Sequence, residues 1–316
     1  MSLAFLFPGQ GAQRPDMLGT LPRSPATAEV LDESRTQLAQ LGLRPDIDTA
    51  SALEDTTNAQ LALLIAGVAS ARALTAEHGL IPQFVAGHSV GAFPAAVCAG
   101  VLTLTEALTA VTLRGQLMER ACRDGQWGMA AVSGLPTRTA ADIAGQVGTA
   151  EDPIWLANIN SATQTVFSGT VIGLRSAEDA ARRAGARNYE RLQVSVASHC
   201  PLQQDTARRM AEYLTGLPRR DPSARYLTNT RGRATGSAQT VLDDLAQAVA
   251  RPVQWYDATR LMGELGVTCA LEAIPGHTLT RLLTSAVPGI AAEALQDSGL
   301  APAAAHMQHL LQRTPE

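Results

Sequence analysis

The sequence predicts an α/β fold in which a smaller domain is inserted into a larger one. Short buried-strand patterns alternate with helical patterns along most of the chain, and shorter units replace them between residues 129 and 194. A chain of 316 residues, 46% of them hydrophobic, can bury a full α/β core and a second small core. We therefore assign residues 1–127 and 196–316 to a large domain with a parallel sheet, and residues 128–195 to the small domain.

The first strand pattern covers residues 3–7 and breaks at Pro8 and Gly9. The loop that follows, residues 8–13, has two glycines just past the strand end, which is where ligands bind in open parallel sheets. Its spacing matches no Walker or dinucleotide loop, so an ordinary turn is the alternative interpretation. Helical patterns follow at residues 24–41 and 56–78.

Residues 84–100, FVAGHSVGAFPAAVCAG, predict a nucleophile elbow, the sharp turn that joins a buried strand to a helix. Gly87 and Gly91 lie two residues either side of Ser89, so the backbone can hold the strained turn that exposes the hydroxyl. Val90 opens the helix, and its N–H would face a developing oxyanion. A bare G-x-S-x-G motif is only moderately specific, but here a strand pattern and a helix pattern flank it.

A helix with a capping box begins after Thr103 and continues to about residue 123. Arg114 lies on its apolar face, where a guanidinium is costly unless it is paired. Two interpretations stay open: an internal ion pair with a distant carboxylate, or a bidentate clamp for the carboxylate of a substrate.

The middle of the chain predicts six short elements in the order strand, helix, strand, strand, helix, strand. This is the order of a ferredoxin-like unit. The six ranges are residues 129–133, 137–147, 154–157, 165–168, 173–184 and 189–194.

His199 lies where the chain returns to the large domain, at a junction between a strand and a helix that Pro201 opens. A lone histidine is more often structural than catalytic. His88 adjoins Ser89 but points elsewhere, because neighbouring residues do not share a face. The later elements are strands at residues 225–228 and 267–271, helices that open after Pro252 and near His277, and a last helix at residues 301–312.

Composition excludes several functions. All 25 basic residues are arginine, so mechanisms that need a lysine, such as P-loop phosphate binding or a pyridoxal Schiff base, are ruled out. A net charge of −4 gives no case for nucleic acid. No apolar run approaches the length that spans a bilayer, and we expect no membrane span and no signal peptide. The four cysteines form no C-x-x-C pair and no metal cage, which indicates reduced thiols and a cytoplasmic protein: Cys98, Cys122, Cys200 and Cys269.

The chain resembles the malonyl-CoA:acyl carrier protein transacylase family along nearly its whole length. Five ordered stretches carry the resemblance: FPGQGAQ (7–13), GHSVG (87–91), LRGQLM (113–118), SHC (198–200) and PVQW (252–255). The resemblance implies an α/β-hydrolase-like large domain with a ferredoxin-like small one, no bound cofactor, malonyl-CoA as substrate, and the prosthetic-group thiol of an acyl carrier protein as acceptor.

The resemblance also implies a role for each matching residue. Ser89 is the acylated nucleophile, and His199 is the base that takes its proton. The backbone carbonyl of Gln254 holds the other imidazole nitrogen, in place of the acid of a hydrolase triad. Gln10 supplies a second oxyanion N–H beside that of Val90.

For substrate binding, the resemblance implies that Arg114 grips the free carboxylate of malonyl. Asn158 and Asn160 match asparagines of the family's small domain near the entrance of the site. We also expect an acidic carrier to dock on arginines of the small domain and the following helix, with a solvated charged face as the alternative. These arginines are Arg182, Arg183, Arg187, Arg208 and Arg209.

The sequence differs from the fatty-acid-synthesis members just after the elbow, where those enzymes usually have glutamate (GHSLGE) and this chain has Ala92, Phe93 and Pro94. With RPDML after the first loop, GHSVGAF most resembles the malonate decarboxylase epsilon subunit. That protein loads the decarboxylase's own carrier subunit, through a phosphoribosyl-dephospho-CoA thiol, with malonyl from malonyl-CoA. We expect Ala92 and Phe93 to lie beside the incoming thiol arm, and Pro94 to distort the elbow helix.

Three other functions stay open. The first is a malonyl-CoA:acyl carrier protein transacylase of fatty-acid or polyketide synthesis. The second is a serine hydrolase or thioesterase, which normally needs an acid after the serine and a histidine late in the chain. The third is a non-catalytic assembly subunit, against which the intact set of Ser89, His199 and Arg114 argues.

Overall fold

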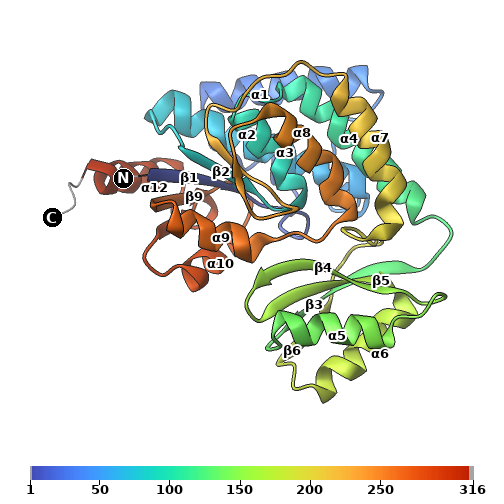
Figure 1. Cartoon of the computed structure of the whole chain (residues 1–316). Coiled ribbons are helices and arrows are strands. Elements are labelled where there is room, and N and C mark those ends of the chain that lie inside the picture. Colours follow the sequence, from blue (N-terminus) through green and yellow to red (C-terminus); the bar gives the residue numbers. More distant parts are fainter. Residues whose placement is uncertain (1, 313–316) are drawn as a thin grey trace.

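In the computed structural model, which describes residues 2–312, the chain forms two β-sheets flanked by helices (Figure 1). The larger sheet has six strands in the order β10-β9-β1-β2-β7-β8, and all its neighbours are parallel except β7 and β8. Its strands are β1 (Ser2–Phe7), β2 (Phe84–Gly87), β7 (Arg225–Leu227), β8 (Ala234–Thr235), β9 (Val267–Glu272) and β10 (Ala291–Ala294).

Helices cover both faces of this sheet because successive side chains of a strand point to opposite faces. Leu3, Phe5 and Phe7 of β1 enter one core, whereas Ala4 and Leu6 enter the other. The first core is built with α1 (Pro25–Gln40), α2 (Thr56–His78), α3 (Ala92–Cys98), α4 (Leu104–Ala121), α7 (Gln204–Thr215), α8 (Ala238–Gln247) and α12 (Leu300–Gln312). The second is built with α9 (Trp255–Glu264) and α10 (Thr278–Ala286), and α11 (Leu295–Ser298) precedes α12.

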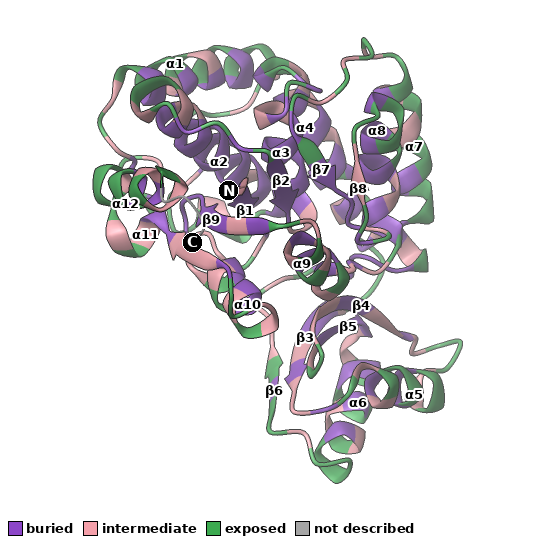
Figure 2. Cartoon of the chain, turned by 60° about the vertical axis from the view of Figure 1, so that its left-hand side comes forward, coloured by how far each residue is buried: buried purple, intermediate pink, exposed green. Residues whose placement is uncertain are grey.

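Helix α2 lies in the middle of the first core, where Figure 2 shows it almost entirely buried. By length and hydropathy it could cross a membrane, so the expectation that no apolar segment reaches that length is wrong. However, 83% of its most apolar window is buried inside the protein. The segment is therefore the central helix of the core, apolar on every side because it is surrounded by protein.

The smaller sheet is antiparallel, with the strand order β4-β5-β3-β6. The order of elements predicted between residues 129 and 194 is the observed one, and α5 and α6 pack together on one face of the sheet. The bounds are β3 (Trp127–Ser133), α5 (Thr137–Val147), β4 (Ile154–Ser161), β5 (Gln164–Thr170), α6 (Val171–Arg183) and β6 (Asn188–Arg191).

One residue just before α9 pairs with the small sheet. Val253, which precedes α9, donates its N–H to the carbonyl of Ala157 and accepts from the N–H of Ile159, both at 2.9 Å. Ala157 and Ile159 belong to β4, so Val253 adds one residue of pairing to the edge of the small sheet. In Figure 1, β4 lies on the side of the small sheet that is nearest to α9.

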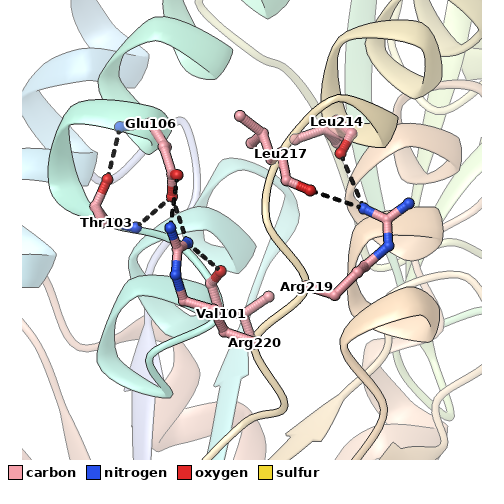
Figure 3. A network of polar contacts seen from close by, with 7 residues as sticks. All are labelled: Val101, Thr103, Glu106, Leu214, Leu217, Arg219 and Arg220. Atoms are coloured by element: carbon pink, nitrogen blue, oxygen red, sulfur yellow. Dashed lines mark hydrogen bonds and ion pairs between the residues drawn. The ribbon is translucent and has the colours of Figure 1, made fainter.

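The start of α4, the helix that carries Arg114, is fixed by a charged network (Figure 3). Glu106 completes the capping box with Thr103, and both carboxylate oxygens accept from the guanidinium of Arg220 at 2.8 and 2.9 Å. Arg220 also donates to a carbonyl just before α4, and Arg219 donates to two carbonyls near the end of α7. The network thus ties the segment after α7 to the first turn of α4.

Candidate active site

Ser89 lies at the turn between β2 and α3, in the left-handed backbone region with φ 54°. A Cβ at Gly91 would lie 2.1 Å from the carbonyl oxygen of Phe7, and one at Gly87 would lie 2.0 Å from backbone atoms of Gly91. Both positions therefore require glycine, because the elbow is in contact with itself and with the end of β1. The predicted nucleophile elbow is present.

The helix after the elbow opens near Val90, as the sequence indicates, and it continues through Pro94 without the expected distortion. A 3-10 turn, η2 (Ser89–Gly91), leads directly into α3, so Pro94 lies in the first turn of that helix. A first-turn position tolerates a missing N–H, because that donor has no partner within the helix anyway.

His199 is brought to Ser89 from a segment 110 residues away. Its Nε2 lies 2.8 Å from Ser89 Oγ, and its Nδ1 lies 2.6 Å from the backbone carbonyl oxygen of Ala248. Because a carbonyl can only accept, Nδ1 carries the proton, and Nε2 is free to accept the proton of the Ser89 hydroxyl. The arrangement is that of a nucleophile and its general base.

The expectation that the carbonyl of Gln254 holds the imidazole is wrong. Ala248 follows α8 and opens the 3-10 turn Ala248–Ala250, and its carbonyl accepts from His199 Nδ1 as well as, at 3.4 Å, from the N–H of Arg251. The Gln254 carbonyl instead accepts from the N–H of Ala258 in α9, and its N–H donates to the Asn229 carbonyl at 2.7 Å. The PVQW segment therefore binds the backbone of Asn229 and does not orient His199.

The pKa of His199 is lowered to about 3, mainly by burial and secondly by the positive charge of Arg114. The hydrogen bond to the Ala248 carbonyl opposes both effects. The ring is 2% exposed and is therefore neutral at physiological pH. A neutral imidazole is the form that can act as a base toward Ser89.

Arg114 reaches the same hydroxyl from α4. Its Nη2 donates to Ser89 Oγ at 3.2 Å, and its Nη1 donates to the side-chain oxygen of Gln60. The residue is 2% exposed, and burial lowers its pKa to about 10, so it remains charged at neutral pH. A buried cation thus lies directly beside the hydroxyl of Ser89.

The alternative interpretation of Arg114, an internal ion pair, is wrong. Within residues 2–312, no carboxylate lies within ion-pair distance of its guanidinium, and its side-chain partners are an amide and a hydroxyl. Taking a charge out of water without a counter-charge is expensive. The site is therefore electrostatically suited to an anionic group.

Gln10 and Val90 belong to segments that meet at the elbow. The loop that holds Gln10 follows β1, and a Cβ on its neighbour Gly9 would lie 2.5 Å from the His88 carbonyl oxygen. The N–H of His88 in turn donates to the carbonyl of Phe7 at 3.0 Å. The two segments are thus adjacent, as a pair of oxyanion donors requires, and the donor role itself stays a prediction.

Asn158 and Asn160 lie on β4 and contact His88 rather than Ser89. His88 Nε2 is 2.9 Å from Asn160 Oδ1 and 3.5 Å from Asn158 Nδ2, and its ring packs on Trp255. Desolvation lowers the pKa of His88, which keeps it neutral. The two asparagines therefore join the small sheet to the residue before the nucleophile.

Two side chains at the site were not predicted from the sequence. Gln60 of α2 is fully buried and holds Arg114, and the signal for it was an amide next to the most apolar stretch of the helix. Asn229 follows β7 and accepts from the N–H of Ser89 at 2.9 Å. Nothing local marks Asn229, because it lies 140 residues from its partner.

Three of the five arginines expected to bind a carrier are engaged on their own helices. Arg182 pairs with Glu178, and Arg208 and Arg209 pair with Asp205. These exposed intrahelical pairs cancel much of the positive charge. In the part of the chain that the structure describes, no group of three or more His, Cys, Asp or Glu residues is placed to hold a metal ion.

Comparison with known proteins agrees with this geometry. The acyl transferase domain family matches residues 4–304. The malonyl CoA-acyl carrier protein transacylase of Escherichia coli K12 is 33% identical over 305 residues, covering 95% of this chain and 98% of its own. The protein of the same name from Bacillus subtilis 168 is 32% identical over 286 residues, covering 89% of each chain.

Solved structures show the same fold. The malonyl CoA-acyl carrier protein transacylase of Coxiella burnetii superposes with a TM-score of 0.87 at 32% identity, covering 95% of both chains. A malonyl-transacylase in complex with a type II polyketide synthase acyl-carrier protein gives 0.87 at 32% identity, covering 97% of this chain and all of its own. Together with the serine, histidine and arginine at the elbow, these similarities show that the chain belongs to the acyl transferase domain family and is an acyltransferase.

Proposed function

We propose that this enzyme transfers malonyl from malonyl-CoA to the thiol of an acyl carrier protein through a malonyl ester of Ser89. The observation that carries the proposal is the buried guanidinium of Arg114, which has no carboxylate partner among residues 2–312 and lies 3.2 Å from Ser89 Oγ. An acyl group that ends in a carboxylate would supply the missing counter-charge through two charge-assisted hydrogen bonds. A neutral acyl group would leave the cation unpaired.

In the first half-reaction, Ser89 Oγ attacks the thioester carbonyl carbon while His199 Nε2 takes the hydroxyl proton. The N–H groups of Val90 and Gln10 would stabilise the oxyanion. As the tetrahedral intermediate collapses, the C–S bond breaks, and His199 returns the proton to the sulfur of CoA. The second half-reaction runs the same steps in reverse, with the carrier thiol as the attacking group.

The Ala248 carbonyl replaces the acid of a hydrolase triad in this scheme. It fixes the tautomer of His199 through a hydrogen bond, and it brings no formal negative charge to stabilise the imidazolium. A hydrolase triad has an acid at this position, so the carbonyl argues against the hydrolase or thioesterase alternative.

For the acceptor, we infer a carrier of fatty-acid or polyketide synthesis, supported by the names of the relatives and of the carrier complex. The argument for a malonate decarboxylase carrier relied on Ala92 and Phe93 lying beside the thiol arm. Both side chains are 1% exposed and belong to the core, so neither meets an incoming arm. The resemblance of GHSVGAF is what still supports the decarboxylase carrier.

We also propose the domain organisation expected from the sequence, with residues 128–195 as a ferredoxin-like domain inserted into an α/β-hydrolase-like one. The antiparallel order β4-β5-β3-β6 and the two helices on one face support the first part. The mainly parallel sheet with the elbow after β2 supports the second. A cytoplasmic location belongs to the same proposal.

One assay tests the function. Wild-type enzyme is mixed with malonyl-CoA, without and then with a phosphopantetheine carrier or a carrier bearing the phosphoribosyl-dephospho-CoA arm, and each protein is weighed by mass spectrometry. We expect one malonyl group on the enzyme, absent from Ser89→Ala, that moves to the phosphopantetheine carrier faster than it is hydrolysed. Release of free malonate without any transfer would show a hydrolase. Faster loading of the other carrier would favour the decarboxylase role.

A further inference from the structure

One side chain, Asn229, holds both peptide groups that flank the residue before the nucleophile. Its Oδ1 accepts from the N–H of Ser89, and its Nδ2 donates to the carbonyl of Gly87, each at 2.9 Å. Asn229 is only 4% exposed, and it reaches the elbow from the loop after β7. The two bonds span the turn on which Ser89 takes its positive φ.

Asn229 is itself fixed by its own backbone. Its N–H donates to Asp244 Oδ2 at 2.8 Å, and its carbonyl accepts from the N–H of Gln254 at 2.7 Å. All the polar groups of this buried asparagine therefore have partners, so its side chain has one orientation. A fully satisfied buried amide is rigid, because any rotation breaks bonds that water cannot replace.

Asp244, on α8, is the anchor of this arrangement. Besides the Asn229 N–H, its carboxylate accepts from the hydroxyl of Tyr226 at 3.1 Å and from the N–H and hydroxyl of Thr230 at 2.9 and 2.6 Å. Burial raises the pKa of Asp244, and these hydrogen bonds counteract the rise. Four donors on one buried carboxylate hold the loop after β7 at a fixed distance from the elbow.

We propose that Asn229, held by Asp244, is a positioning residue that keeps Ser89 in its strained, reactive conformation. A positive φ at a residue other than glycine persists only where its surroundings force it. Without Asn229, the Ser89 N–H and the Gly87 carbonyl would lose their partners, and the turn would relax. Ser89 Oγ would then leave its place 2.8 Å from His199 and 3.2 Å from Arg114.

The inference rests on the proposed acyl transfer at Ser89, and its test separates positioning from folding. The variants are Asn229→Ala, Asn229→Asp, which keeps the acceptor for Ser89 but loses the donor to Gly87, and Asp244→Asn. The matched control is Glu272→Gln, because Glu272 is also a fully buried carboxylate that accepts two backbone N–H groups, here at the start of α10. None of its hydrogen bonds in the described chain reaches the elbow.

For each variant, the rate of Ser89 malonylation is measured in a single turnover over a range of malonyl-CoA concentrations, below the thermal midpoint measured by circular dichroism. We expect Asn229→Ala to slow saturated loading about 100-fold, the scale of a nucleophile misplaced by about 1 Å. The half-saturating concentration should change by less than about threefold, because Arg114 and Gln60 are untouched. Asn229→Asp and Asp244→Asn should lose about tenfold, and Glu272→Gln should lose stability but load within about twofold of wild type.

A folded Asn229→Ala enzyme that loads at the wild-type rate overturns the proposal. If that variant does not fold, wild-type loading by Asn229→Asp and Asp244→Asn overturns it equally. The same variants are also labelled with a fluorophosphonate, which reports the reactivity of Ser89 without needing a malonyl group. Wild-type labelling without any malonylation would show that the proposed function is wrong, and the labelling rates would still decide the role of Asn229.

Discussion

Arg114 donates to the hydroxyl oxygen of Ser89 across 3.2 Å, so the serine at the elbow has a buried cation as its direct neighbour. The same guanidinium is held by Gln60 and not by a carboxylate. Because Gln60 is neutral, the positive charge of Arg114 is not compensated and still attracts an anion. This relationship links the identity of the acyl group to the chemistry at Ser89.

Replacing Arg114 with alanine should therefore change which acyl group is loaded. We expect malonyl loading to lose about 2 to 5 kcal/mol of transition-state stabilisation, the usual cost of removing one partner of a buried charged pair. Acetyl loading should fall less or rise, since the unpaired cation no longer opposes it. Rates of Ser89 acylation by malonyl-CoA and acetyl-CoA measure both. Arg114→Lys should recover little, because an ammonium cannot form the planar fork, and equal losses for both donors would exclude the clamp.

Replacing His199 with alanine should slow Ser89 acylation by about 10²- to 10⁴-fold, the range for loss of a general base. The reason is the 2.8 Å contact between its Nε2 and Ser89 Oγ. Single-turnover loading with malonyl-CoA measures the effect. A matched control is His306→Ala, since His306 is an exposed histidine on α12 that pairs with Glu293. Similar losses in the two variants would mean that His199 is not the base.

The pH dependence of loading follows from the lowered pKa of His199. Because the ring becomes protonated only near pH 3, the base stays available as pH falls through roughly 6.5, the ordinary histidine value. We expect a loading rate without an acid limb near pH 6.5, measured with stopped reactions between about pH 5 and 8. A fall in the loading rate below pH 6.5 that is seen in wild type and is lost only in His199→Ala would contradict this expectation.

The same shift affects stability. Below about pH 6.5 the unfolded chain takes up a proton at His199 that the folded chain does not, so acidification favours unfolding. This contribution to stability is present above the ordinary pKa and is lost progressively toward about pH 3. His88, whose pKa is also lowered by burial, acts in the same direction. Midpoints of urea unfolding at several pH values check the sign.

The contact between the elbow and the end of β1 predicts a large effect of one methyl group. In Gly91→Ala the new Cβ would lie 2.1 Å from the Phe7 carbonyl oxygen and 2.7 Å from that of Pro8. We expect a loss of about 1 to 3 kcal/mol in the free energy of unfolding, as for overpacked cores, together with slower loading. Gly145→Ala is the control, since it lies within α5 with open space around its Cβ, and it should stabilise the helix slightly. Thermal unfolding of both variants decides the point.

Of the five arginines expected to bind an acidic carrier, Arg183 and Arg187 are the best candidates. Both are exposed, and no carboxylate of residues 2–312 lies within ion-pair distance of either, unlike Arg182, Arg208 and Arg209. Replacing both arginines with glutamate should raise the KM for an acidic carrier, and the rise should be larger at low salt. The KM for malonyl-CoA should not change. Arg225→Glu, at the opposite end of β7 from the site, is the control. An unchanged carrier KM at low ionic strength would exclude this surface.

An element could be predicted from the sequence where its own residues mark it. The elbow and the buried strands β1, β2, β7 and β9 were evident because apolar runs and glycines mark them directly. The strands β8 and β10 were missed. The first has two residues, and the second reads AAEA, without a β-branched or aromatic side chain.

At the site, Ser89, His199 and Arg114 were found from the sequence, whereas Ala248, Gln60 and Asn229 were missed. Arg114 was noticed because a charge on an apolar helix face is unusual, and Ser89 because of the motif around it. The carbonyl that orients His199 belongs to Ala248, and a carbonyl leaves no mark on residue type. Asn229 could be identified only once β7 was placed beside β2.

The pairing of Val253 with the edge of β4 determines what can be exchanged between related enzymes. These hydrogen bonds join backbone atoms only, so the side chains of Val253 and of β4 can differ between enzymes without breaking the pairing. Their geometry, however, requires the inserted segment and residues 252–254 to keep one register. A chimera that brings in a foreign 128–195 segment must therefore preserve the length and path of β4 at Ala157 and Ile159. Otherwise Val253 will shift together with its neighbour Gln254, whose N–H binds the carbonyl of Asn229.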